Sequence, residues 1–372
     1  MATPTNLHIA VIPGDGIGIE VTDAALEVMR EAERAVGKFR CEYQNLPAGA
    51  FCYRDTGESL PKETVDQSAK ADAVFLGACG WPEIRYPDGT EIRPQVELRF
   101  IFDLYAGVRP IRFFKGLPKV LANPKDKPID LIIIRESTEG LFASRGTGKN
   151  REVATETLVI TRRTTERLMK FGYHLARQRK AQGHRGQLLC VDKANIFSSM
   201  AFMRGIYDEI GRDFPDVEKG AMYVDAAALN LVRQPWNFDV MVMENMYGDI
   251  LSDLGAGLIG GMGMAPSGDI GDTHAVFQPS HGTAPDIAGK GIANPLAMIL
   301  SGAMMYRWLA DRKQLPALND AAARIEDAVA RFLETGDRMP YDQGGRAKTA
   351  EIAEGVLKAM ATARLAGPGT AC

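Results

Sequence analysis

The alternation of short apolar runs with longer amphipathic stretches constrains the fold most. Five apolar runs have the length of buried strands and are bounded by polar or glycine residues: residues 7–13, 73–78, 130–135, 188–191 and 238–243. Between most of them apolar residues recur at helical spacing, as in residues 164–177. This alternation is typical of α/β folds with a largely parallel sheet. The 372 residues suffice for two domains or one large one.

The charge balance and the cysteines restrict the expected partners and compartment. The chain has 44 Lys+Arg against 47 Asp+Glu, a formal net charge of -3, which gives no reason to expect nucleic acid or a membrane surface as partner. No stretch approaches the roughly 18 apolar residues of a membrane span, and the N-terminus lacks a signal-peptide pattern. Five scattered cysteines form no C-x-x-C pair. We therefore expect a soluble, cytoplasmic protein.

A glycine-rich turn follows the first apolar run, at residues 14–18 (GDGIG). Glycines there would let backbone N–H groups approach a pyrophosphate at a helix N-terminus. The third glycine of the G-x-G-x-x-G fingerprint would fall at position 19, which is Ile19. A tight strand-to-helix turn is therefore favoured over a dinucleotide site.

Residues 245–253 (NMYGDILSD) carry a stronger signal. If a helix begins near Tyr247, Asp249 and Asp253 stand on one face near its N-terminus, where negative charge is tolerated. Two such carboxylates suit a hard divalent ion such as Mg²⁺. The alternative is a solvated helix face with Asp249 near the cap.

Four basic residues and one loop suggest an anionic ligand. Arg99, Arg109 and Arg135 lie in apolar or turn contexts, where each needs a structural or a ligand carboxylate as partner. Three of them together suggest a small di- or tricarboxylate. Lys193 follows a strand, either as a surface lysine or as a proton-transfer group. The non-periodic residues 281–295 are either a site loop or a surface connection.

Several longer strings together identify a likeness. They are IPGDGIG, DLYAGVRP, RESTEGLF, DKANIF, NMYGDILSDLGAGLIGG and HGTAPDIAGKGIANP. The chain resembles, nearly end to end, the isocitrate and 3-isopropylmalate dehydrogenase family of metal-dependent β-decarboxylating dehydrogenases, which includes tartrate, malate and homoisocitrate members. The resemblance implies a two-domain fold with a large mixed sheet flanked by helices, distinct from a Rossmann fold. Residues 1–104 plus 260–372 would bind the cofactor. Residues 105–259 would bind metal and substrate and form a homodimer, with an exposed arm near 143–153.

The resemblance also implies roles for individual residues. Lys193, linked to Asp225, would help remove the proton of the substrate hydroxyl, and both would serve the neighbouring subunit's site. The substrate carboxylates would be held by Arg99, Arg109 and Arg135, beside Gln95. Mg²⁺ or Mn²⁺ would be bound by Asp249 and Asp253 of one subunit and Asp225 of the other. The cofactor would be held by His281, Gly282, Ala284, Asp286, Asn294 and Asn195. Asp286 favours NAD, because its carboxylate would repel a 2′-phosphate and the NADP-using members carry a Lys-Tyr pair at Asp286-Ile287.

Several positions depart from the family pattern, among them Ile19 in place of a proline and Arg93 in place of the serine of isocitrate members; three others bear more directly on function. Phe142 replaces a tyrosine that protonates the enol, so that step would fall to Lys193, to water or to a side chain such as Ser144. Gln278 replaces a glutamate. Gln95 replaces the leucine of 3-isopropylmalate members, and its amide would lose water against an isopropyl group, a cost of about 1 to 3 kcal/mol.

These departures leave three functional hypotheses. The leading one is oxidative decarboxylation of a substrate with a polar C3 substituent, such as tartrate, isocitrate or homoisocitrate, or with none, as in (R)-malate. Arg93 would pair with a distal carboxylate if it points into the site. The alternatives are a 3-isopropylmalate dehydrogenase and, from another class, a non-catalytic regulatory subunit.

Overall fold

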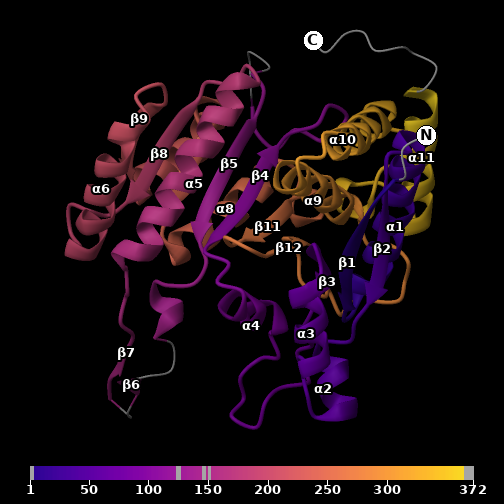
Figure 1. The fold of residues 1–372 in the computed structure, drawn as a ribbon, viewed down its shortest axis with the longest axis horizontal. Coiled ribbons are helices and arrows are strands. Elements are labelled where there is room, and N and C mark those ends of the chain that lie inside the picture. Colours follow the sequence, from indigo (N-terminus) through magenta and orange to yellow (C-terminus); the bar gives the residue numbers. More distant parts are fainter. Residues whose placement is uncertain (1–3, 123–126, 145–147, 150–151, 364–372) are drawn as a thin grey trace.

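The computed structural model describes residues 4–122, 127–144, 148–149 and 152–363, and their main feature is one mixed sheet (Figure 1). Its ten described strands follow the order β2 (Phe39–Asn45), β1 (Thr5–Gly14), β3 (Ala73–Ala78), β12 (Ala275–Pro279), β11 (Pro266–Ile270), β4 (Ala106–Arg112), β5 (Asp130–Glu136), β10 (Val240–Met243), β8 (Gln187–Asp192) and β9 (Glu218–Tyr223). All five predicted strands are present.

The sheet is parallel at both sides and antiparallel at its centre. Strands β2, β1, β3 and β12 pair in parallel, and so do β5, β10, β8 and β9. Between them β12, β11, β4 and β5 pair antiparallel. The α/β class and the mixed sheet are thus confirmed, while the largely parallel arrangement holds only for the outer strands.

Helices flank the sheet (Figure 1). Their bounds are α1 (Ile17–Val36), α2 (Ala50–Thr56), α3 (Lys62–Lys70), α4 (Pro94–Ile101), α5 (Arg162–Ala181), α6 (Ser198–Ile210), α7 (Val224–Arg233), α8 (Asn245–Leu258), α9 (Leu296–Lys313), α10 (Ala317–Thr335) and α11 (Thr349–Ala363). Helices α1 and α9 pack against the β1 to β3 side, whereas α5 and α6 pack against β8. Among the described residues, no helix combines the length and apolarity needed to cross a membrane.

The two halves of the sheet come from different parts of the chain. Strands β2, β1, β3, β12 and β11 derive from the two ends of the chain, and the other five derive from its middle. The domain boundaries at 104/105 and 259/260 remain a prediction. In the predicted arm, β6 (Gly148–Lys149) pairs with β7 (Ala154–Thr155) in a hairpin that extends away from the sheet (Figure 1). Residues 145–147 and 150–151 of that arm lie outside the described residues.

The glycine-rich residues 14–18 form the predicted turn between strand β1 and helix α1. The buried carboxylate of Asp15 accepts hydrogen bonds from the backbone N–H groups of Ala50, Phe51 and Gly80 at 2.7, 3.0 and 2.8 Å. Gly16 has a φ of 57°, and a Cβ there would lie 2.3 Å from the carbonyl oxygen of Thr283. The N–H of Ile17, the first residue of α1, donates to that same oxygen at 3.0 Å. The turn therefore anchors the 281–295 loop to the sheet.

Candidate active site

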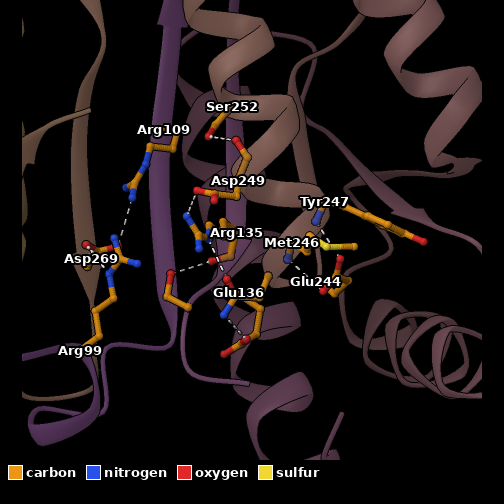
Figure 2. Close-up of polar contacts among 12 residues, drawn as sticks. Arg99, Arg109, Arg135, Glu136, Glu244, Met246, Tyr247, Asp249, Ser252 and Asp269 are labelled. Atoms are coloured by element: carbon orange, nitrogen blue, oxygen red, sulfur yellow. Dashed lines mark hydrogen bonds and ion pairs between the residues drawn. The ribbon is translucent and has the colours of Figure 1, made fainter. Parts of the chain in front are cut away.

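Two predicted arginines, Arg99 and Arg109, contact one buried aspartate, Asp269, and the third, Arg135, lies nearby and contacts Asp249 (Figure 2). Arg99 comes from α4, and its Nε lies 3.1 Å from Oδ2 of Asp269. Arg109 comes from β4, and one of its guanidinium nitrogens lies 3.4 Å from Oδ1 of the same carboxylate. Burial, followed by the charge of Arg99, lowers the pKa of Arg135 to about 10. Arg135 therefore feels the charge of its neighbour, although it stays protonated at pH 7. Mutually repelling guanidinium groups favour binding of an anion between them.

Asp269 was missed at the level of sequence. It lies on β11, with none of its surface exposed. Burial acts to raise the pKa of Asp269, but the charges of Arg99, Arg109 and Arg135 outweigh it and leave the pKa below its usual value. The carboxylate is therefore ionised and compensates part of the arginine charge. The signal that could have identified Asp269 is that it is a lone acidic residue within an otherwise buried strand.

Arg135 is fixed from the other side by α8. Its Nε donates to the side-chain oxygen of Asn245 at 2.9 Å, and its guanidinium forms an ion pair with Asp249. The amide nitrogen of Asn245 in turn donates to the backbone carbonyl of Glu139 at 2.9 Å. The guanidinium also lies 5.1 Å from the ring centre of Phe142. Asn245, a second missed residue, thus orients Arg135.

The predicted metal pair lies on the second and third turns of α8. The helix begins at Asn245, two residues earlier than expected, and the buried carboxylate of Glu244 caps it by accepting from Met246 N at 3.0 Å and Tyr247 N at 2.7 Å. Glu244 is therefore the N-cap of the helix, whereas the interpretation of this segment as a solvated helix face placed the cap near Asp249. Burial and the charge of Asp249 raise the pKa of Asp253. The two carboxylates repel each other, which a divalent cation would relieve.

Lys193 and Asp225 form a separate pair. The Nζ of Lys193, just after β8, lies 2.6 Å from Oδ1 of Asp225 in the first turn of α7. The hydrogen bond from Lys193 lowers the pKa of Asp225. Among the described residues, no group of three Asp, Glu, His or Cys side chains could hold a metal ion. One chain therefore brings Asp225 to Lys193 and leaves Asp249 and Asp253 as a pair.

The predicted cofactor residues lie mainly on the 281–295 loop. The side-chain oxygen of Asn294 accepts from Leu296 N at 3.0 Å, and its nitrogen lies 3.1 Å from Asp342, a third missed residue. The Nε2 of His281 is buried without a partner among the described residues. Burial lowers the pKa of His281, so its ring is neutral at pH 7.

The remaining predicted residues are placed as follows. Gly282, Asp286 and Asn195 are exposed, and Ala284, packed against the core, has a φ of 40°. Gln95 lies in the first turn of α4, and its Oε1 is buried without a hydrogen-bond partner in the described structure. Arg93 precedes that helix at its N-cap position.

The contact of α8 with β5 predicts that alanine substitutions at two glycines of α8 change the stability of the protein in opposite directions. A Cβ at Gly248 would lie 2.5 Å from the Cβ of Arg135, whereas a Cβ at Gly257 would meet nothing within 4 Å. We expect G248A to lower the free energy of unfolding by roughly 1 to 3 kcal/mol through overpacking. The control G257A should raise it by about 0.5 to 1 kcal/mol, since alanine is the better helix former. Urea denaturation measures both, and equal effects would contradict the contact.

Comparison with known proteins shows which family this chain belongs to. A model of the isocitrate/isopropylmalate dehydrogenase family matches residues 8–356. A Methanocaldococcus jannaschii protein named 3-isopropylmalate/3-methylmalate dehydrogenase is 39% identical over 351 residues, covering 94% of this chain and 98% of that one. A homoisocitrate dehydrogenase of the same organism is 36% identical over 362 residues, covering 94% and 97%. The crystal structure of isocitrate dehydrogenase from Methylococcus capsulatus superposes with a TM-score of 0.82 at 35% identity, covering 95% of this chain and 99% of that one. The chain therefore belongs to the isocitrate/isopropylmalate dehydrogenase family.

Proposed function

We propose that this chain oxidises a 2-hydroxy acid bearing a carboxylate at C3 and releases that carboxylate as CO₂, with NAD⁺ and Mg²⁺ or Mn²⁺ as cofactors. The observation that carries the proposal is a buried cluster in which Arg99 and Arg109 contact the carboxylate of Asp269 and the charge of Arg135 also acts on that carboxylate. Family membership supports the class of reaction. The excess positive charge suits a substrate with at least two carboxylates.

The residues present fit both cofactors. Asp249 and Asp253 repel each other across one helical turn, as expected of two ligands aimed at one cation. The Nε2 of His281, which has no hydrogen-bond partner in the described part of the chain, can donate to or accept from a nucleotide, and the loop that carries it is anchored to α1. When bound, the metal would act as a Lewis acid toward the substrate's C2 oxygen, and NAD⁺ would accept the hydride from C2.

The chain's own side chains would bind the acid and move its protons. Arg99, Arg109 and Arg135 would orient the carboxylates. Lys193, poised by Asp225, would take the proton of the C2 hydroxyl. Phe142 has no proton to donate after decarboxylation. The hydroxyl of Ser144 donates to the carbonyl of Thr157 at 2.5 Å, which favours Lys193 or water as the donor.

The substrate's C3 substituent is proposed to be polar or absent. The buried Oε1 of Gln95 has no donor among the described residues, and leaving it so costs about 1 to 3 kcal/mol. A hydroxyl or a water bound beside an unsubstituted C3 would satisfy it, whereas an isopropyl group would not. Relatives are named for 3-isopropylmalate, 3-methylmalate and homoisocitrate, which are acids that differ in the substituent at C3.

A substrate panel tests this assignment. We expect kcat/KM on tartrate, (R)-malate, isocitrate or homoisocitrate to exceed that on 3-isopropylmalate by at least about tenfold. Q95L should shift the ratio toward 3-isopropylmalate, because the wall becomes apolar. NADH formation in the presence of Mg²⁺ measures both. Dominant turnover of 3-isopropylmalate by the unaltered protein would select the alternative dehydrogenase, and no turnover on any acid would select the regulatory subunit.

The choice of dinucleotide is predicted by Asp286, which is exposed on the 281–295 loop. A carboxylate accepts hydrogen bonds from the ribose 2′-hydroxyl of NAD⁺ and repels the 2′-phosphate of NADP⁺. We expect kcat/KM for NAD⁺ to exceed that for NADP⁺ by about a hundredfold or more, and D286N to reduce the ratio mainly by improving the use of NADP⁺. A preference for NADP⁺ in the unaltered protein would contradict the role of Asp286.

We further propose that two copies of the chain share each site. Large apolar side chains are exposed after Lys193 (Ile196 and Phe197), on α7 (Leu229 and Val232) and on α8 (Ile250). Large apolar side chains exposed on neighbouring elements are typical of a surface that another protein covers, and helices α7 and α8 contact each other. A homodimer through this surface would bring Asp225 of one subunit near the Asp249–Asp253 pair of the other.

Mixed dimers provide the test of shared sites. D225N and D253N alone should each be nearly inactive, because each damages both sites. A refolded equimolar mixture should recover about a quarter of the wild-type activity, since half of the dimers are mixed and each of these has one intact site. Sites built within one chain would give no recovery. Mixing either variant with itself is the control.

A further inference from the structure

Four adjacent strands present one set of polar residues on the same face of the sheet. In the register of the sheet, Asp269 of β11 lies opposite Gly107 of β4, and Gly107 lies opposite Arg135 of β5. Arg109 stands two residues beyond Gly107 and therefore on the same face. A Cβ at Gly107 would lie 3.1 Å from Oδ1 of Asp269 and 2.6 Å from the hydroxyl of Ser137. Glycine thus leaves room for the carboxylate between the arginines.

Gln278 of β12 completes this arrangement. Its amide nitrogen donates to Oδ2 of Asp269 at 2.7 Å, the same oxygen that Arg99 approaches to 3.1 Å. The Gln278 side chain is buried, and its backbone carbonyl accepts from the hydroxyls of Ser267 and Ser301, both at 2.9 Å. The amide is therefore held in place on a fixed strand and presents a donor to Asp269.

We propose that Asp269 and Gln278 act as a positioning pair that orients Arg99 and Arg109 and sets the charge available to the substrate. Asp269 contributes one negative charge against these two guanidinium groups, which leaves one positive charge for a substrate carboxylate. A second carboxylate at 278 would cancel that charge and would face Asp269 without a donor between them. The pair thus accounts for the amide at Gln278, where the family pattern has glutamate. The inference rests on the proposed function.

Binding of (R)-malate, the core shared by all candidate substrates, tests the pair. Isothermal titration calorimetry with Mg²⁺ and without NAD⁺ measures affinity independently of turnover. We expect Q278E to weaken binding by about tenfold or more, and D269N/Q278E, which returns the pair to one negative charge, to recover it to within about threefold of wild type. In turnover assays Q278E should raise KM more than it lowers kcat. Q278M, which is neutral but lacks the donor, should lie between wild type and Q278E.

A matched control separates positioning from stability. Gln187 is also buried and donates to a carboxylate, Glu218, at 2.9 Å, and Glu218 is paired with Arg185 on the outer strands. Both Q278E and Q187E should lower Tm through carboxylate repulsion, Q187E by less because the Glu218 side chain is 47% exposed, and only Q187E should leave (R)-malate affinity unchanged.

The outcomes also separate this inference from the proposed function. Each of four results would overturn the positioning pair. They are unchanged (R)-malate affinity in Q278E, no recovery of affinity in the double variant, Q278E binding (R)-malate no worse than Q278M, and no binding of (R)-malate by wild type. If the affinities follow the expected order but wild type forms no NADH on any acid, the pair stands as part of an anion site and the proposed reaction falls. If Q278E or the double variant does not fold, Q278M against wild type carries the test, and equal affinities would overturn the pair.

Discussion

The shared carboxylate of Asp269 is the interaction around which the site's charges are arranged. A buried guanidinium costs several kcal/mol unless it is paired, and this chain buries Arg109 and Arg135 and nearly buries Arg99. Asp269 pairs with Arg99 and Arg109, while Arg135 pairs with Asp249. Because Asp249 is also a candidate metal ligand, a cation that binds it would compete with Arg135 for its carboxylate. Arg135 would then need a substrate carboxylate as its partner. Binding of metal and acid would thus reinforce each other.

The antiparallel centre of the sheet makes this arrangement possible. Strand β11 comes from a part of the chain distant from β4 and β5, and the register of the three strands aligns Asp269, Gly107 and Arg135 in one row. An all-parallel sheet would place such residues at strand ends, where ligands of α/β folds usually collect. Here the charged row crosses the sheet itself, so burial is deep and the geometry is held by backbone pairing. Lys193 follows the usual rule at the end of β8, and so does Asp225 after the end of β9.

Individual residues show how far the sequence could predict the site. The pair Asp249 and Asp253 was identified from helical spacing, and the helix is present with a start displaced by only two residues. The three arginines were identified from their apolar context, and their convergence is a property of the fold. Asp269 and Asn245 were missed because their partners are far away in sequence: Asp269 is 170 residues from Arg99, and Asn245 is 110 residues from Arg135. No local pattern encodes such pairs.

The sequence by itself determined the α/β class, the family and the strands, and it named candidate residues for an anionic substrate and a divalent metal, because periodicity and motifs are local properties of the chain. Tertiary structure alone decided which carboxylate compensates which arginine, and it brought the amide of Gln278 to the carboxylate of Asp269. These depend on strand order and register, which bring together side chains that share no local pattern. Burial then makes each charge strongly dependent on its nearest partner.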